Sequence, residues 1–508
     1  MLNIFRESMI YQVIFRCLTY FEHIYQNSVL AAIIRHSFIG RIPRYYEEKE
    51  PLFLSSFFVK LLKVIAGFFK KIVDLIMRPV WNGKLAFVKE AKVFHIPYEI
   101  LVYLIALFGF ADFVFRQYFS GLSSVWDELF LILLVCVWVY KWMTEKDAEA
   151  YKMSPFDMSI LIFIGIMVLE MFVSARFNIA FEGFRAIVQS MFWYFVAFQL
   201  LKSEKTIKYL VTVFVGGTGL LGIHGIYQYI IGVEMPSTWV QSSEVGIRTR
   251  VFSIFTSPNI FGSLLVLAIP MCVALFFVSN KVWQKILFLG LAGCMGGALL
   301  FTYSRGAWIG AVFAAGVYVL MKDKRLIIPA VIAGVLIFIC VPSISERLLF
   351  MLSPEYMAAS MRGGRLIRWI TGLQILQEHP MFGLGLGGFG GAVAAHHDLQ
   401  AVVRGSVVDT FYMDNYYMKI AAEAGLLGIA AFVFLMWQVF SVSVKTVHIT
   451  KNKQVKEIGI GITAGLTGVI IHCFVENIFE VPMMGVLFWT FVAAMAQMWY
   501  SNYKKQSK

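Results

Sequence analysis

The feature that most constrains this chain is a series of apolar segments, each long enough to cross a lipid bilayer as a helix. From residue 98 onward the sequence contains twelve of them, at 98–116, 125–142, 157–174, 184–201, 207–231, 261–279, 286–302, 307–321, 327–341, 414–440, 457–475 and 483–500. Hydrophobic residues make up 59% of the chain and charged residues only 15%, which is more apolar sequence than a soluble core of this length can bury. We therefore predict an all-α polytopic membrane protein with about 12 transmembrane helices and a large external loop before the tenth span.

The connections between these segments alternate in charge. The lysine-rich ones lie near Lys146, Lys205, Lys281, Lys322, Lys451 and Lys504. Because cytoplasmic loops are enriched in lysine and arginine, this alternation places both termini in the cytoplasm. It also makes 232–260 and 342–413 external, and the second of these is long enough to carry helices of its own and to form a lid.

The apolar segments divide the chain into four parts. Residues 1–97 form a basic cytoplasmic or interfacial region, in which 53–78 has the pattern of an amphipathic helix that lies on a membrane surface or against the protein's own cytoplasmic side. Residues 98–341 hold spans one to nine, 342–413 the external loop, and 414–508 spans ten to twelve with a cytoplasmic tail. Within the loop, the pattern at 362–378 predicts a helix.

Lysine and arginine separate between the two sides of this topology. The cytoplasmic loops and tail hold 17 lysines and one arginine, Arg325, whereas the external segments hold 11 arginines and one lysine, Lys419. Membrane insertion treats the two cations alike, but only arginine grips a phosphate through two parallel hydrogen bonds. The split therefore predicts an external face that holds a phosphorylated lipid. The alternative is that single arginines pair with Glu355, Asp409 or Glu423, or reach the lipid head groups.

Several function classes are disfavoured by composition and spacing. The net charge of +13 suits loops that face anionic lipid and needs no nucleic acid. The six cysteines have no C-x-x-C spacing, and the pair His396-His397 has no further metal ligands at suitable spacing, so we expect no metal and no cofactor. Residues 385–390 fit G-x-G-x-x-G, but without a preceding strand they do not predict a dinucleotide site. These glycines are better suited to a backbone that approaches a membrane-facing ligand.

Two arginine motifs border the predicted spans. Arg248 and Arg250 precede Pro258-Asn259, a pair that suits the start of a helix but leaves the arginines unexplained. Arg305 lies in the tight external turn between two spans, where a charge is costly unless it snorkels, pairs or serves a site.

The external loop adds a second group of motifs. Arg362, Arg365 and Arg368 are spaced to share one helical face, which is either a solvated face or a binding face. Asp414-Asn415 then opens the tenth span, with Gly425 and Gly428 behind it. A helix N-cap needs only one of Asp414 and Asn415, and glycines at this spacing permit close helix packing.

Taken in order, these motifs resemble the O-antigen ligase and O-antigen polymerase superfamily, which includes teichuronic-acid polymerases, over about residues 155–500. The resemblance implies metal-independent, inverting glycosyl transfer on the outer face of the cytoplasmic membrane. The implied donor is a glycan on undecaprenyl diphosphate, and the acceptor is a glycan or another hydroxyl compound. A flippase and a chain-length regulator are further candidate partners, besides the bilayer itself.

The resemblance also assigns roles residue by residue. Arg250 and Arg305 match the two arginines that hold the diphosphate, and Arg368-Trp369 matches a feature of the loop. Ligases carry a histidine just before the asparagine that corresponds to Asn415. Here that residue is Asp414, which favours a polymerase and makes Asp414 the candidate group that orients the acceptor and accepts its proton.

The predicted site therefore has a catalytic and a substrate-binding group of residues. The catalytic group is Asp414, Arg250 and Arg305, and the substrate-binding group is Arg248, Arg365, Arg368, Trp369, Asn415 and Asn259. Two other classes remain open: a lipid-linked glycan transporter or flippase, and a non-catalytic scaffold of envelope polysaccharide assembly. A transporter of this size is expected to show two similar halves and polar residues near mid-membrane. The sequence shows no such halves, and its ionisable residues collect at one face, with Glu170 a rare exception.

Overall fold

The computed structural model describes residues 99–119, 121–144, 151–236, 249–323, 325, 327–340, 342–362, 364–403, 406–409 and 412–506. The basic N-terminal region, with its predicted amphipathic helix at 53–78, lies outside the described residues, and so does Arg248. The four-part division of the chain remains a prediction.

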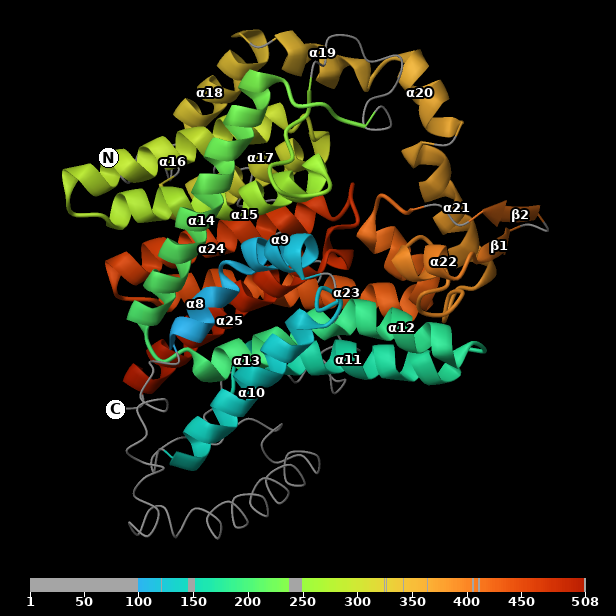
Figure 1. The fold of residues 1–508 in the computed structure, drawn as a ribbon, viewed down its shortest axis with the longest axis horizontal. Coiled ribbons are helices and arrows are strands. Elements are labelled where there is room, and N and C mark those ends of the chain that lie inside the picture. The colour runs from blue at the N-terminus through green and yellow to red at the C-terminus, as the bar shows by residue number, and fades with distance from the viewer. Residues whose placement is uncertain are drawn as a thin grey trace, which may run out of the picture. The chain divides into compact units, whose positions relative to one another are not determined.

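Helices account for nearly all of the described chain (Figure 1). In the first half they are α8 (Glu99–Ile105), α9 (Phe108–Tyr118), α10 (Trp126–Thr144), α11 (Pro155–Val173), α12 (Phe177–Val188), η2 (Gln189–Met191), α13 (Phe192–Leu200), α14 (Glu204–Ile231) and α15 (Pro258–Val278). There follow α16 (Val282–Phe301), α17 (Arg305–Lys322), α18 (Ile327–Cys340), α19 (Pro342–Phe350), α20 (Pro354–Met361), α21 (Arg365–Glu378) and α22 (Ala392–His396). After a β-hairpin of β1 (Gln400–Val403) and β2 (Ser406–Asp409) come α23 (Tyr416–Ile449), α24 (Lys453–His472), η5 (Ile478–Glu480) and α25 (Pro482–Gln506).

Seven of the described helices are long and apolar enough to cross a membrane: α11, α14, α15, α16, α23, α24 and α25. The chain is thus an all-α polytopic membrane protein, as predicted. The other five predicted spans coincide with helices that are shorter, interrupted or more polar: α8–α9, α10, α12–α13, α17 and α18. The first of these was expected as one helix over 98–116, but the chain turns at Ala106-Leu107.

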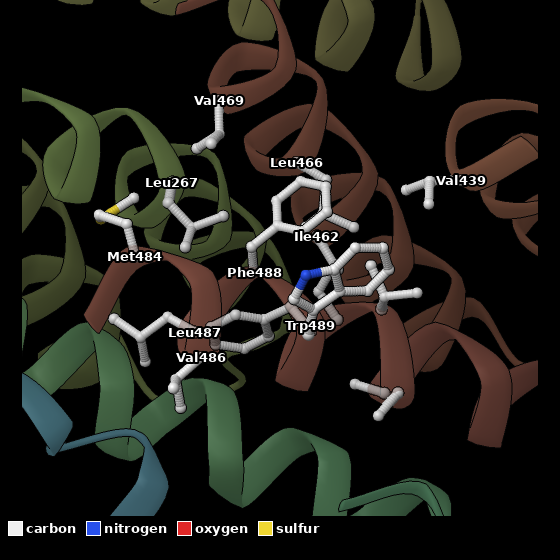
Figure 2. Close-up of a cluster of buried hydrophobic side chains, with 14 of the residues drawn as sticks. Leu267, Val439, Ile462, Leu466, Val469, Met484, Val486, Leu487, Phe488 and Trp489 are labelled. Atoms are coloured by element: carbon white, nitrogen blue, oxygen red, sulfur yellow. The ribbon is translucent and has the colours of Figure 1, made fainter. Parts of the chain in front are cut away.

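The core forms where α24 packs between α15 and α17 and against α25. Figure 2 shows Leu267 of α15, Leu466 of α24 and Phe488 of α25 meeting there, all of them buried. Glycines bring the backbones close, because a Cβ on Gly465 would lie 2.4 Å from the Leu267 carbonyl oxygen. The same holds between α17 and α24, where a Cβ on Gly310 would lie 2.7 Å from the Gly468 carbonyl oxygen.

The segment 342–413 contains α19 to α22 and the hairpin, whose register runs from Gln400 opposite Asp409 to Val403 opposite Ser406. The predicted helix at 362–378 is α21, which starts three residues later because Gly364 is its N-cap. Arg362 is instead the C-cap of α20. The expectation that Arg362, Arg365 and Arg368 share one helical face is therefore wrong for Arg362.

The glycine run after α21 packs against the first part of α23. Gly425 has φ 61° and ψ −160° inside α23, a conformation that is essentially confined to glycine. This break frees helix carbonyl groups, so Leu384 N–H donates to Ala422 O at 2.9 Å and Gly385 N–H to Glu423 O at 3.0 Å. Gly387 packs instead on α12, where a Cβ on Gly183 would lie 2.3 Å from the Gly387 nitrogen. The approach of these glycines to a ligand remains a prediction.

Candidate active site at the loop end of the helices

Arg250 is a buried arginine in the segment that precedes α15. It lies at the end of the helices that the segment 342–413 covers. This end is here called the loop end. Its Nε donates to the Thr302 carbonyl oxygen at 2.9 Å. The neighbouring Val251 N–H donates to Phe301 O at 3.0 Å. The backbone that carries Arg250 is therefore fastened to the α16–α17 turn, which also carries Arg305.

Asn259 connects Arg250 to Glu476, which lies 217 positions after Asn259 in the sequence. Its Oδ1 accepts from Arg250 Nη2 at 3.1 Å, and its Nδ2 donates to Glu476 Oε2 at 2.5 Å. The helix start does not require this side chain, because Ser257 is the N-cap and Pro258 occupies the first turn. The structure thus places the predicted site residue Asn259 in the arginine cluster rather than at a cap.

Glu476 lies in the turn that joins α24 to α25 and is buried, with 9% of its surface exposed. Arg365 Nη2 approaches its Oε2 at 3.4 Å. Burial raises the pKa of Glu476 to about 7; Arg365 opposes this shift, Asp414 adds to it, and Arg250 opposes it more weakly. A buried carboxyl group that ionises near neutral pH is typical of a functional site.

Asp414 precedes α23 and faces the two arginines of α21. Arg368 Nη1 lies 2.8 Å from Asp414 Oδ2, and Arg365 Nε lies 3.7 Å from the same oxygen. Arg368 also donates to the Tyr412 carbonyl oxygen at 3.1 Å. Arg365 therefore contacts both Asp414 and Glu476, which brings the predicted loop arginines and the predicted Asp414 into one cluster with Asn259 and Arg250.

Two other predicted residues have structural tasks. Asn415 is the N-cap of α23 and accepts from Met418 N–H at 3.0 Å, so the cap falls to Asn415 and not to Asp414. Trp369 packs on the small apolar cluster of the loop, which contains Ile375 and Phe389. Their roles in substrate binding remain predictions.

Arg305 begins α17, and its neighbours explain the sequence around it. Ser304 caps the helix by accepting from Ala307 N–H. A Cβ on Gly306 would lie 2.8 Å from the buried His472 ring, so only glycine lets α17 pack there. The Arg305 guanidinium lies 4.8 Å from the centre of the Tyr356 ring. A cation at a helix N-terminus opposes the helix dipole, so its position is not explained by helix stability.

The external lysine of the predicted topology, Lys419, is buried in the first turns of α23. Its Nζ lies 3.0 Å from Glu423 and 3.9 Å from Glu480. Glu423 was one of the acids considered as an arginine partner, but its partner is this lysine. Glu480 also accepts from Ala392 N–H at 2.7 Å, which ties α22 to the α24–α25 turn.

A separate pocket of about 380 Å³ opens beside the same turn. Its polar wall includes Asp127, Glu128, Gln189 and Glu480, and its apolar wall includes Trp126. Glu128 accepts a hydrogen bond from Gln189 Nε2 at 3.0 Å and forms a salt bridge with Arg185. The arginine cluster does not line this pocket, and the turn from residue 473 to 481 runs from one to the other.

Sequence reasoning missed three residues of this region. Glu476 was detectable as an acid next to a predicted span, but its partners lie far away in sequence. His472 is fully buried and contacts the Ser263 hydroxyl through Nδ1 at 2.9 Å. Arg347 of α19 is buried with its guanidinium 5.8 Å from the centre of the Tyr303 ring. Three histidines of the segment 342–413, His379, His396 and His397, lie on the surface.

Comparison with known protein families identifies a match to part of the chain. A family model described as O-antigen ligase matches residues 290–433, from α16 through the segment 342–413 into α23. This range includes Arg305, Arg365, Arg368 and Asp414, whereas Arg250, Asn259 and Glu476 lie outside it. None of the curated proteins compared with the chain matches it.

Proposed function

We propose that this protein, whose residues 290–433 match the O-antigen ligase family model, moves or polymerises a lipid-linked glycan at its loop end. In this proposal the loop end faces the outside of the cytoplasmic membrane, and the donor is a glycan on undecaprenyl diphosphate. The product is a lengthened glycan, so the protein acts as a polymerase rather than a ligase.

The observation that carries this proposal is the convergence of cations on one site. Arg250 and Arg365 approach a shared pair of side chains, Asn259 and Glu476, and Arg368 joins them through Asp414. Arg305 lies on the turn to which Arg250 is bonded. Because withdrawing a cation from water is costly, one buried arginine (Arg250) and three partly buried ones, drawn from three separate elements, point to an anionic ligand of high charge, such as a diphosphate.

The proposed chemistry is a single displacement. An acceptor hydroxyl attacks the anomeric carbon of the donor sugar, and the bond from that carbon to the diphosphate oxygen breaks, which inverts the configuration. Negative charge develops on the leaving diphosphate. Fixed arginine donors in a dry site stabilise this charge. They thereby provide the electrostatic stabilisation that a divalent metal provides in other transferases.

We assign the acceptor to the pocket beside the α24–α25 turn. Its carboxylates and the Gln189 amide offer hydrogen-bond acceptors for sugar hydroxyl groups. Glu128→Gln is expected to raise the KM for the acceptor while the KM for the lipid donor stays within about twofold. Equal changes in both constants would remove the acceptor from this pocket.

The lipid-linked glycans that accumulate in a deletion strain test the function itself. A polymerase leaves single repeat units on the lipid, on the outer face of the membrane. Finished long polymer on the lipid would make the protein a ligase. Single units held on the cytoplasmic face would make it a flippase, and an unchanged lipid pool would leave only a scaffold.

A further inference from the structure

Glu476 has a position that the arginine clamp alone does not require. Three of its neighbours come from separate elements: Asn259 from α15, Arg365 from α21 and Asp414 from the segment before α23. We propose that Glu476 is the group that accepts the proton of the acceptor hydroxyl. This assignment rests on the proposed glycosyl transfer and adds a catalytic residue outside the family match.

The geometry of Glu476 suits a proton acceptor. The contacts from Asn259 Nδ2 at 2.5 Å and from Arg365 Nη2 at 3.4 Å both fall on Oε2. Together with a hydrogen bond from the Asn477 backbone N–H they fix the carboxyl group, and we assign Oε1 as the oxygen that meets an incoming hydroxyl. Through Asn259 the same carboxyl group is held one side chain away from Arg250, so base and diphosphate clamp keep a fixed separation.

Two other candidates are less suited to this role. Asp414 is held by two arginines, at 2.8 Å and 3.7 Å, and both cations lie on the same oxygen. Its contacts are those of an anchor for α21, which makes it a positioning residue. His472 is fully buried with 0% exposure, so an acceptor hydroxyl cannot reach its ring.

Charged and titratable groups lie near Glu476 on each of the elements that pack around it. They are Arg250 before α15, Arg365 on α21, Tyr412 and Asp414 before α23, and His472 and Cys473 at the end of α24. Burial raises the pKa of Glu476 to about 7. Near neutral pH the carboxylate is thus partly ionised and close in proton affinity to the working pH, which is where a general base is most effective.

The acceptor O–H proton passes to Glu476 Oε1 while the acceptor oxygen forms its bond to the anomeric carbon. The electron pair of the broken carbon–oxygen bond leaves with the diphosphate. The protonated Glu476 then returns its proton to water after the products separate, and the next turnover begins with the carboxylate.

The test compares the pH dependence of glycan transfer for the wild type, Glu476→Gln and Glu476→Asp in detergent-solubilised full-length protein. The wild-type rate should rise with pH around a midpoint of about 7, because the active form is deprotonated. Glu476→Gln keeps the size and the hydrogen-bond geometry but cannot take up the proton, so its rate should fall by about 10²–10⁴-fold and lose this rise. Glu476→Asp should keep part of the rate and a pH-dependent rise.

Glu182→Gln is the matched control, because Glu182 is an exposed carboxyl group on α12 whose partner is His397. Its rate and pH profile should equal those of the wild type.

Binding of undecaprenyl diphosphate separates the two proposals: Glu476→Gln should bind this carrier normally, and Arg250→Lys should not. Normal binding with a Glu476→Gln rate within a few-fold of wild type, or a wild-type rate that is flat across pH 7, overturns Glu476 as the base alone. A wild type that does not bind the carrier overturns the proposed function.

Discussion

Arg250 donates a hydrogen bond from Nε to the carbonyl oxygen of Thr302, at 2.9 Å. This one contact joins the segment before α15 to the α16–α17 turn, and Arg305 follows three residues later. The Arg250 side chain is thus fixed to the backbone turn that leads directly into Arg305, the first residue of α17. The sequence marks the two arginines at separate loops, and this turn connects their positions.

The first prediction concerns the fork of Arg305. Arg305→Lys keeps the charge but loses the bidentate grip on phosphate, so we expect the amount of glycan product to fall by about 10²-fold. The measurement is product formation in a deletion strain that carries the variant at normal membrane levels. Arg176→Lys is the control, because Arg176 is exposed at the start of α12, and it should be nearly silent. Equal behaviour of the two variants would contradict a diphosphate clamp.

The second prediction concerns Asp414. As an anchor for α21 it contributes one charged hydrogen bond, from Arg368 at 2.8 Å, so Asp414→Asn should lower the transfer rate by about tenfold. Because the Asp414 carboxylate helps to raise the pKa of Glu476, the pH midpoint should move below that of the wild type, and the rise of the rate with pH should remain. If Asp414 is the proton acceptor instead, the rate should fall by about 10²–10⁴-fold, and Asp414→His should restore part of it. The pH–rate profiles of both variants distinguish the two roles.

The third prediction concerns the break in α23. Gly425 lies in a backbone region that is essentially confined to glycine, and an added Cβ would meet the Met381 carbonyl oxygen at 2.3 Å. Gly425→Ala should therefore destabilise the protein by about 1–3 kcal/mol, measured as a lower melting temperature in detergent. Gly290→Ala is the matched control, since a Cβ there meets nothing within 4 Å on α16, and its melting temperature should not fall. An unchanged melting temperature for Gly425→Ala would show that α23 does not need its break.

The fourth prediction concerns topology. Single cysteines at His396, Asp323 and Asn452, on a cysteine-free background, occupy exposed sites in the described chain. In intact cells an impermeant maleimide should label the first position and spare the other two, because the lysine-rich loops are cytoplasmic. Labelling at Asp323 or Asn452 would reverse the orientation and with it the outward-facing site.

The sequence predicted the helices well, because apolar length alone specifies a membrane span. The segment 207–231 corresponds to α14 at Glu204–Ile231, and 457–475 corresponds to α24 at Lys453–His472. Local breaks escaped this approach. Nothing in composition marks the turn at Ala106-Leu107, or the break in α23 whose carbonyl groups accept from Leu384 and Gly385.

The site was predicted only in part, since its contacts are distant in sequence. Asn259 and Glu476 are 217 residues apart, and Arg365 and Glu476 are 111 residues apart. One sequence can mark Arg250, Arg305 or Asp414 as costly charges next to spans, but it cannot reveal which of them share a partner. Glu476 is recognisable as a site residue only in the fold, where the end of α24 lies beside the start of α15 and Asn259 reaches it.

In the proposed mechanism, arginines hold the diphosphate of a lipid-linked donor while its glycan is transferred. The most direct test is the release of undecaprenyl diphosphate from a lipid-linked glycan donor by the purified full-length protein in EDTA, with Arg250→Lys measured beside the wild type. We predict that the wild type releases the carrier in EDTA and that Arg250→Lys does so about 10²-fold more slowly, because the remaining ammonium group cannot grip two phosphate oxygens. Equal rates for the two proteins, or wild-type release that stops in EDTA and returns with magnesium, would contradict the account.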